Sequence, residues 1–431
     1  MSRREEFRAL LTSAHQYVLA AAIVGVLTGF AVVGFERIVV NIIFNRLVAH
    51  LPLVVLAIMP GIGLALATLW LRGPGHGLSP STSDEYLDAF HADHPLTLRA
   101  LANRIVAAVA TLGSGCALGL EGPSIYIGAT IGNAAQRRFK RYLFGADRNL
   151  LLVAGAAAGI AAIFKAPATG AVFAIEVPYQ DDLARRMLLP ALVAGASGYL
   201  ALVAINGTAP LFPISGVPPL SFVDLMGAAL LGLAGGLGAR AFAWMLRAAK
   251  RASDRARVWA RVGTAGATIA LLFAIGRGFT GQNLVLTPGY GVVLWALNPR
   301  RSVGILLLLL VLRCCATSAA VAGGGVGGLF VPLVVAGALL GRVFGVVIGH
   351  DSSLFLVVGI AAFLGSGYRV PLAAIMFVAE TTGHAGFVVP GVIAAVVAEL
   401  VMGRSSVTTH QMQVRPGSAP PGASDIGPDA A

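Results

Sequence analysis

Hydrophobic residues occur along this chain in long runs that no charged residue interrupts. Three of these runs are residues 17–35, 51–71 and 314–341. Each is as long as the roughly 20 residues that an α-helix needs to cross the hydrocarbon core of a bilayer. The pattern therefore predicts an all-α polytopic membrane protein that contacts the lipid bilayer along most of its length.

Two segments from the first part of the chain recur in the second part. Residues 119–133, GLEGPSIYIGATIGN, align with residues 328–342, GLFVPLVVAGALLGR. Residues 155–176 align with residues 359–380 in the same way, again through glycine, alanine, proline and one glutamate. Two matches in the same order, at nearly equal separations, indicate an internal duplication.

The basic residues that follow the matched segments differ between the two copies. In the first copy they are Arg137, Arg138, Lys140 and Arg141, followed later by Arg185 and Arg186, whereas the equivalent places in the second copy carry almost no Lys or Arg. Because basic loops of membrane proteins stay in the cytoplasm, the two copies are predicted to cross the membrane in opposite directions. Inverted repeats of this kind, with broken helices meeting near the bilayer midplane, are typical of transport proteins.

The charge pattern also divides the chain into five parts. We expect a cytoplasmic N-terminal segment 1–16, a first membrane half 17–246, a basic cytoplasmic connecting loop 247–261, a second membrane half 262–412 and a disordered C-terminal tail 413–431. The first residues resemble a twin-arginine signal, but two glutamates spoil its basic region and no clean cleavage site follows. Both termini are therefore expected in the cytoplasm of a cell-membrane protein.

Composition agrees with this location. The chain is 57% hydrophobic and 12% charged, whereas soluble proteins carry about 25% charged residues. Basic cytoplasmic loops account for the net charge of +12, so we infer no nucleic-acid partner. The cysteines Cys116, Cys314 and Cys315 lie in apolar segments and form neither a disulfide framework nor a metal motif, and no cofactor is expected.

Glu121 is the only charged residue in the apolar segment 119–129. Pro123 and Pro332 each predict the start of a short helix that follows non-helical backbone. Because the free N–H groups of a helix N-terminus bind anions, two oppositely oriented copies would form an anion site near the bilayer centre. Glu121 is then predicted to compete for that site as a tethered anion, although a structural glutamate bound by backbone amides is the alternative.

The motifs around this glutamate resemble those of the CLC family of chloride channels and proton-coupled anion antiporters. The sequence GLEGP at 119–123 is similar to the family's G-R-E-G-P, and GLFVP at 328–332 fits its G-x-F-x-P. The segment FKAPATGAVFAIE at 164–176 is also similar, and the resemblance covers about residues 18–411. It implies a homodimer with one pore per subunit that transports chloride, of the prokaryotic type without C-terminal regulatory domains.

The resemblance also implies roles for individual residues. Glu121 matches the family's gating glutamate, and Leu329 and Phe330 match the residues whose backbone N–H groups hold the central anion. Leu120 and Gly122 complete the implied anion-binding set. Leu120 departs from the family's usual arginine, so part of the external positive field is lost.

Three further positions depart from the family's pattern. Val177 stands where many proton-coupled members carry an internal glutamate. The family's central serine has no clear counterpart, and Pro80, Ser79 or Ser81 is expected in its place. Thr408 falls about where the pore tyrosine is expected, which would leave a wider inner pore.

These departures decide the predicted function. Because valine can neither bind nor release a proton, we expect passive, channel-like and chloride-selective conduction gated by Glu121. Proton-coupled chloride antiport is the alternative. An intramembrane enzyme is a remote alternative, since no nucleophile–base set or catalytic acid pair stands out.

Other polar residues have two interpretations each. Glu176 and Glu380 are matched in the two copies and are expected to be structural acids rather than relays. Lys165 and Arg369, also matched, either attract anions toward the pore or anchor helix ends. A third set, His91 and His94 beside Asp93, has the spacing of metal ligands, but a solvated loop is the favoured interpretation and no metal is expected.

Overall fold

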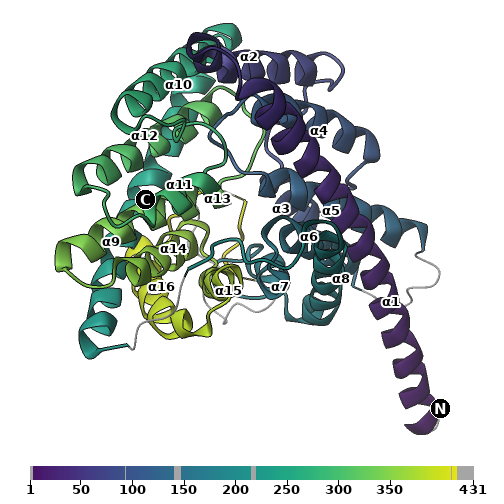
Figure 1. Ribbon diagram of the computed structural model, residues 1–431. Coiled ribbons are helices and arrows are strands. Elements are labelled where there is room, and N and C mark those ends of the chain that lie inside the picture. The colour runs from purple at the N-terminus through teal and green to yellow at the C-terminus, as the bar shows by residue number, and fades with distance from the viewer. Residues whose placement is uncertain (1–2, 93, 140–146, 215–219, 409, 415–431) are drawn as a thin grey trace, which may run out of the picture.

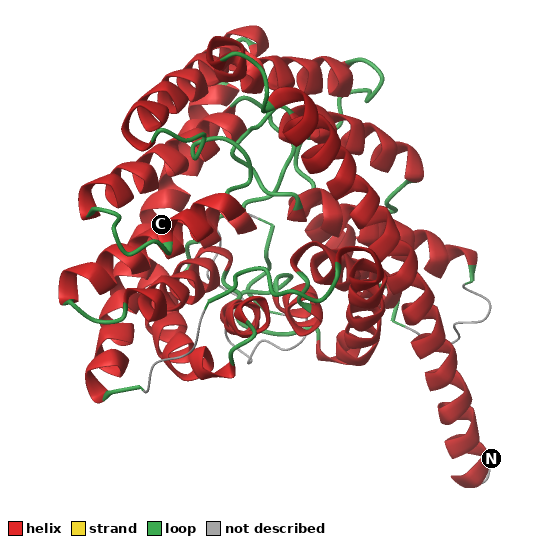
Figure 2. Cartoon of the chain, in the orientation of Figure 1, coloured by secondary structure: helices red, strands yellow, loops and turns green. Residues whose placement is uncertain are grey.

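The computed structural model describes the chain except for residues 1–2, 93, 140–146, 215–219, 409 and 415–431, and except for the side chains of residues 3–14 and 352. The described part contains 16 α-helices and no β-strand (Figures 1 and 2). The helices of the first half are α1 Arg3–Glu36, α2 Leu53–Arg72, α3 Ser83–Ala92, α4 Leu98–Gly113, α5 Glu121–Arg138, α6 Leu150–Phe164, α7 Pro167–Glu176 and α8 Leu188–Asn206. Those of the second half are α9 Phe222–Asp254, α10 Val258–Thr280, α11 Tyr290–Ala296, α12 Val303–Ala322, α13 Phe330–Ile348, α14 Ser352–Tyr368, α15 Pro371–Thr382 and α16 Val388–Met402. A π-helical stretch, Arg37–Val48, continues α1.

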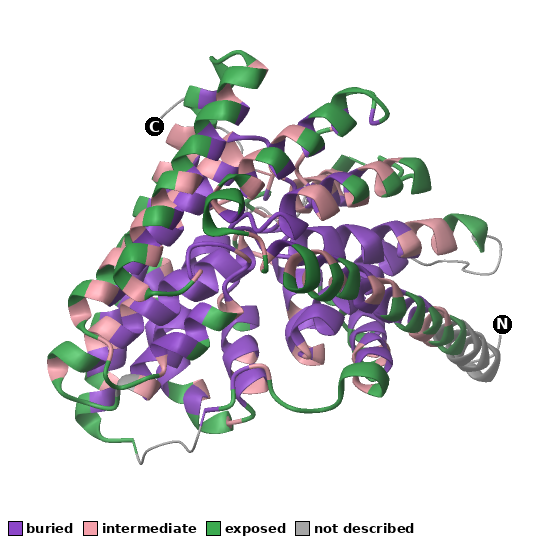
Figure 3. Cartoon of the chain, turned by 45° about the horizontal axis from the view of Figure 1, so that its top comes forward, coloured by how far each residue is buried: buried purple, intermediate pink, exposed green. Residues whose placement is uncertain are grey.

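The outer surface of the bundle is apolar. Eight of the described helical segments are long and apolar enough to cross a membrane, and large hydrophobic side chains such as Phe222 and Leu400 lie exposed on them. Buried residues gather at the centre of the molecule, where the helices of both halves meet (Figure 3). Since so much exposed apolar surface suits lipid and not water, the predicted polytopic membrane fold is confirmed.

The duplication predicted from the sequence is visible in the backbone. Lys165 is the C-cap residue of α6, and α7 begins at Pro167. In the same way, Arg369 is the C-cap residue of α14, and α15 begins at Pro371. Lys165 and Arg369 both adopt the left-handed conformation, with φ of 56° and 57°, which is uncommon for residues other than glycine. The two halves lie side by side, and α7 contacts α15 where they meet (Figure 1).

Matched glycines bring the paired helices close together in both halves. A Cβ atom on Gly155 would overlap the carbonyl oxygen of Gly128, and one on Gly128 would overlap that of Gly155. Gly337 and Gly359 make the same reciprocal approach between α13 and α14. These contacts fix the separation of α5 from α6 and of α13 from α14, the four helices that surround the broken segments.

Each half also caps a short helix of the other half. Glu380 accepts hydrogen bonds at the N-terminus of α7, and Glu176 does so at the N-terminus of α15. The donors are the N–H groups of Ala168 (2.9 Å), Thr169 (2.7 Å), Leu372 (3.0 Å) and Ala373 (2.8 Å). Both carboxylates therefore satisfy free N–H groups at helix starts, which supports the structural interpretation of these two acids.

The helices at the signature motifs differ from the prediction in length and start. We expected short helices beginning at Pro123 and Pro332, but α5 and α13 have 18 and 19 residues and begin at Glu121 and Phe330. Each proline is the third residue of its helix. The N–H of that position has no partner within a helix, so proline is tolerated there as well as at the first position.

The expected segments also differ in detail from the observed elements. Helix α9 continues to Asp254 and includes the first part of the basic segment 247–261, which we expected to be a loop. Counted in whole helices, the second half would begin with α9 and not at residue 262. Helix α1 begins at Arg3, within the predicted segment 1–16, and residues 415–431 of the predicted tail lie outside the described residues.

Substitution of Gly155 tests the close approach of α5 and α6. We expect Gly155→Ala to destabilise the protein by about 1–3 kcal/mol, because the added methyl group overlaps backbone and not a movable side chain. Thermal unfolding in detergent, followed by size-exclusion chromatography, measures the effect. Gly278→Ala in α10 is the control, since a Cβ there meets open space and alanine favours the helix. Equal stability of the two variants would contradict the packing described.

Candidate anion site

The non-helical segments before α5 and α13 pair with each other. The N–H of Gly119 donates to the carbonyl oxygen of Gly328 at 2.9 Å, and the N–H of Gly328 donates to that of Gly119 at 2.7 Å. These glycines are equivalent positions of the duplication. The loops of both halves converge there at the centre of the molecule (Figure 2). The two pairing bonds satisfy backbone groups that would otherwise be unpaired at membrane depth.

The carboxylate of Glu121 lies across this junction. Its side chain is fully buried, and Oε1 accepts hydrogen bonds from the N–H groups of Phe330 at 2.6 Å and Val331 at 3.4 Å. These are the first N–H groups of α13, where the helix dipole is positive. Oε2 is buried and has no hydrogen-bond partner among the described residues. The glutamate therefore occupies the place where a free anion would bind the N-terminus of α13.

Two glycines make room for this carboxylate. A Cβ atom on Gly119 or Gly328 would overlap the carboxyl group of Glu121. The signature glycines thus do more than allow a turn: their missing side chains leave the space that the carboxyl group of Glu121 fills. Leu120, the N-cap residue of α5, is buried beside the same junction.

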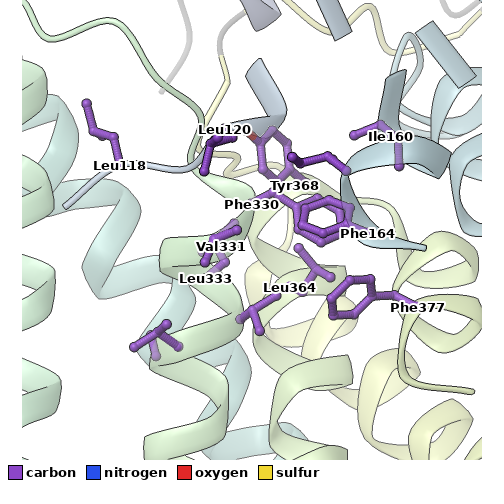
Figure 4. Packing of buried hydrophobic residues seen from close by; sticks show 14 of the residues in the cluster. Leu118, Leu120, Ile160, Phe164, Phe330, Val331, Leu333, Leu364, Tyr368 and Phe377 are labelled. Atoms are coloured by element: carbon purple, nitrogen blue, oxygen red, sulfur yellow. The ribbon is translucent and has the colours of Figure 1, made fainter. Parts of the chain in front are cut away.

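An aromatic cluster holds the N-terminus of α13 in place. The ring of Phe330 stacks on Phe164 with 4.5 Å between centroids and packs edge-on against Phe377 at 5.0 Å and Phe173 at 5.6 Å. Figure 4 shows Phe164, Phe330 and Phe377 packed together below Leu120, with Tyr368 beside Phe330. Because the ring of Phe330 is fixed, its backbone N–H keeps its direction toward Glu121.

A third helix N-terminus, that of α3, borders the site. The hydroxyl of Thr82 lies 2.6 Å from where a Cβ of Gly122 would stand, and this buried hydroxyl has no partner among the described residues. The side chain of the next residue, Ser83, interacts with the hydroxyl of Tyr368, which also interacts with the backbone of Leu329. Hydroxyls of Thr82, Ser83 and Tyr368 therefore lie beside the N-termini of α5 and α13.

The sequence predicted a helix N-terminus in this region but named other residues for it. Ser79 is exposed and its hydroxyl accepts from the N–H of Ser81, while Pro80 is half-buried in the same turn. The hydroxyls of Ser81 and Thr408 both donate to Asp84, at 2.8 and 2.7 Å. The structure thus gathers these residues around the first turn of α3 and places Thr82 and Ser83 nearer to Glu121.

Tyr368 was not found from the sequence, although one signal pointed to it. It is the counterpart of Phe164 in the duplication, so a hydroxyl replaces a hydrogen on one of two matched rings. Both rings belong to the cluster around Phe330. The hydroxyl that Tyr368 has and Phe164 lacks was therefore a signal in the sequence that the two halves contribute differently to the site.

The position of the missing internal acid is filled by apolar packing. Val177 caps the C-terminus of α7 and is buried, and its carbonyl oxygen accepts from Gln411 at 3.0 Å. The neighbouring Glu176 is fully engaged at the N-terminus of α15. Neither residue offers a free titratable group at this position.

The matched cations contact protein groups at helix ends. Lys165 donates to the carbonyl oxygen of Ala209 at 3.1 Å, and Arg369 pairs with Asp181 at 2.9 Å and Glu399 at 3.2 Å. These contacts favour the anchoring interpretation that the sequence left open.

One of the possible metal ligands lies in a helix and not in the solvated loop that we expected, since His91 belongs to the last turn of α3. His91 lies 2.9 Å from the carbonyl oxygen of Pro178 through its Nε2 atom, and Asp93 lies outside the described residues. In the part of the chain that the structure describes, no three His, Cys, Asp or Glu side chains are grouped to hold a metal ion.

Comparison with known proteins agrees with this geometry. A family model described as voltage gated chloride channel matches residues 79–403. The chain is 27% identical to the H(+)/Cl(-) exchange transporter ClcA of Citrobacter koseri, over 89% of this chain and 85% of that protein. It is 28% identical to the protein of the same name from Cronobacter sakazakii, over 89% and 86%.

Solved structures share the fold. The crystal structure of a CLC-type fluoride/proton antiporter superposes with a TM-score of 0.80 at 24% identity, covering 93% of this chain and 98% of the other. A slow cyanobacterial Cl-/H+ antiporter superposes with a TM-score of 0.78 at 23% identity, covering 90% and 94%.

Removal of the Glu121 carboxylate tests its competition with anions. We expect Glu121→Ala to raise the affinity for chloride by about tenfold or more, because chloride no longer has to displace the carboxylate of Glu121 from the site. Binding should also become independent of pH. Titration calorimetry with chloride at several pH values measures both effects, and Glu85→Gln, which changes a carboxylate away from this junction, is the control. Unchanged affinity and pH dependence in Glu121→Ala would show a purely structural glutamate.

Proposed function

Because this chain belongs to the voltage-gated chloride channel family, whose members are membrane transport proteins and not enzymes, we propose that it exchanges chloride for protons across the cell membrane. The observation that carries the proposal is the hydrogen bond from the N–H of Phe330 to the carboxylate of Glu121. The exchange transporters named above, which align with most of the chain, support the same proposal.

Competition for one set of N–H groups explains how the two ions are coupled. An anion that enters the N-terminus of α13 must displace the carboxylate of Glu121 from Phe330 and Val331. A displaced carboxylate loses these donors, so proton uptake becomes the favourable way to neutralise it. Departure of the anion lets the group return and release its proton. Each cycle thereby moves an anion and a proton in opposite directions.

The expectation of passive conduction gives way to the alternative that the sequence left open. Passive conduction was inferred from the valine at position 177, which removes the family's usual internal proton acceptor. The curated relatives are named as H(+)/Cl(-) exchange transporters, and two proteins with solved structures of this fold are described as antiporters. We therefore favour coupled exchange, with inner proton transfer through a group other than residue 177.

The chemistry around Glu121 suits a small anion. Donors dominate it: the free N–H groups of α13 and the hydroxyls of Thr82, Ser83 and Tyr368. Backbone dipoles and hydroxyls replace the hydration shell of an anion and repel no negative charge. Chloride is the proposed substrate, because the curated relatives that align with most of the chain carry it in their names.

We also propose a homodimer formed through α8 and α16. These helices flank the central pair α7 and α15 (Figure 1). The exposed residues are Leu188, Leu189, Leu192 and Leu200 on α8 and Val389, Val392, Val396 and Leu400 on α16. A second copy would cover this surface and leave the anion site of each subunit intact.

Substitutions on that surface test the dimer. We expect Leu200→Trp combined with Val396→Trp to convert a dimer into monomers in detergent, because bulky rings cannot fit a self-complementary interface. Light scattering coupled to size-exclusion chromatography gives the mass. Leu271→Trp, on the exposed face of α10, is the matched control. A monomeric wild type would contradict the proposal.

Reconstitution in liposomes tests coupled exchange directly. We expect a chloride gradient, imposed without a proton gradient, to drive protons uphill in the opposite direction at a fixed ratio. A pH electrode and a chloride electrode follow both ions, with potassium flux measured in parallel. Chloride movement without protons would restore the channel interpretation, and potassium movement equal to that of chloride would contradict an anion site. Replacing chloride with fluoride, bromide or nitrate ranks the substrates.

A further inference from the structure

A polar cluster surrounds Asp84 in the first turn of α3. Its carboxylate accepts hydrogen bonds from the hydroxyls of Thr408 at 2.7 Å and Ser81 at 2.8 Å, and Nδ1 of His410 lies 3.3 Å from the same group. Because Val177 is buried in apolar packing and carries no titratable group, inner proton transfer needs another acceptor, and this cluster contains titratable side chains.

This cluster lies on the side of the protein that carries the basic segments. The segment that holds Thr408 and His410 is bound by Arg247, whose guanidinium donates to the carbonyl oxygen of Ser406 at 3.0 Å and to the hydroxyl of Ser405 at 3.1 Å. Because Arg247 belongs to the basic end of α9, which is expected in the cytoplasm, the cluster faces the inner solution.

His410 connects the cluster to that solution. Its side chain is 35% exposed, and its Nε2 atom lies 3.7 Å from the carboxylate of Asp88, which is 46% exposed. Its Nδ1 atom faces Asp84, which is only 19% exposed. The imidazole thus bridges an outer and an inner carboxylate with its two nitrogens. An imidazole in this arrangement can take a proton on one side and give one on the other.

The other end of the cluster reaches the gate. Ser83 precedes Asp84 in the chain, and its side chain interacts with the hydroxyl of Tyr368. Thr82 precedes Ser83, and its buried hydroxyl, which has no partner among the described residues, lies beside Gly122. Gly122 is next to Glu121. Three consecutive residues with polar side chains, Thr82, Ser83 and Asp84, thus lie between Gly122 at one end and His410 at the other.

We propose that His410 and Asp84 form the inner proton port of this exchanger, in place of the acid that is missing at Val177. The proposal rests on the coupled exchange proposed above. An imidazolium N–H of His410 gives its proton to the carboxylate of Asp84, and neutral His410 takes another from the inner solution, past Asp88. Asp84 then passes this proton on toward Glu121 through the hydroxyls of Ser83 and Thr82. Each hydroxyl oxygen takes up one proton and gives up another, so that every O–H bond broken is replaced by one formed.

Groups around His410 favour its protonated form. The hydrogen bond with Asp84 raises the pKa of His410 above its ordinary value; burial opposes this, Asp84 and Asp88 add to it by charge, and Lys250 of α9 opposes it. Because the pKa is raised, the imidazole is protonated at pH values below its ordinary pKa. It loses this proton only as the pH rises through the raised pKa. The remaining carboxylate of this turn, Glu85, is paired with Arg104 at 2.5 Å.

Two variants and two controls test the port in liposomes. We expect Asp84→Asn to lower the ratio of protons to chloride moved by about tenfold or more, while chloride flux keeps its order of magnitude. His410→Gln should lower proton flux and shift its dependence on inner pH toward acid, with no change in its dependence on outer pH. Ser81→Ala removes one hydrogen bond to Asp84 but no titratable group, and Glu85→Gln removes the carboxylate of this turn that pairs with Arg104. Both controls should keep most of the coupling.

The outcomes separate the port from the exchange itself. A wild type that moves chloride without protons refutes the proposed exchange and the port with it. A coupled wild type whose Asp84→Asn and His410→Gln variants keep the same ratio and the same inner-pH profile refutes the port alone. Loss of chloride and proton flux together in Asp84→Asn shows a structural carboxylate and also refutes it. If Asp84→Asn does not fold, the inner-pH profile of His410→Gln decides.

Discussion

The fold depends on the need to keep one carboxylate at the centre of an apolar protein. Glu121 is fully buried, and two N–H groups at the start of α13 offset the cost of holding it there. Those N–H groups are free only because the helix is broken before Phe330, and the break is tolerated only because Gly119 and Gly328 bond to each other. Glycine packing between α5 and α6 and between α13 and α14 then fixes the helices whose ends meet there.

Each half supplies hydrogen-bonding groups that the other half needs. Glu176 caps α15 and Glu380 caps α7, and the backbone bridge joins equivalent glycines. The copies differ at the first residue of α5 and of α13, where Glu121 binds the N–H of Phe330, its own counterpart in the duplication. A symmetric scaffold thus holds an asymmetric site, in which one position supplies the carboxylate and the equivalent position supplies the N–H donor.

Much of this could be predicted from the sequence, because the duplication and the apolar runs report on backbone geometry directly. Glu121 was singled out in this way, together with the inverted repeat, whereas Phe330 came from the resemblance of GLFVP to the family's motif. The residues Thr82, Ser83 and Tyr368 were not found, because α3 begins after a turn of irregular length and counting along the chain cannot place it. Thr408 was expected near the pore from its position alone, yet its hydroxyl is bound to Asp84. Such side-chain contacts between distant helices leave little trace in a single sequence.

The reciprocal capping by Glu176 and Glu380 has a consequence for the origin of the protein. Either half alone would present one short helix without a cap and one buried carboxylate without a donor. Two copies of a half-length ancestor, inserted in opposite orientations in the same membrane, would have supplied both to each other. Gene fusion would then have replaced a balance between two insertion directions with one chain of fixed topology, after which Glu121 and Phe330 were free to diverge.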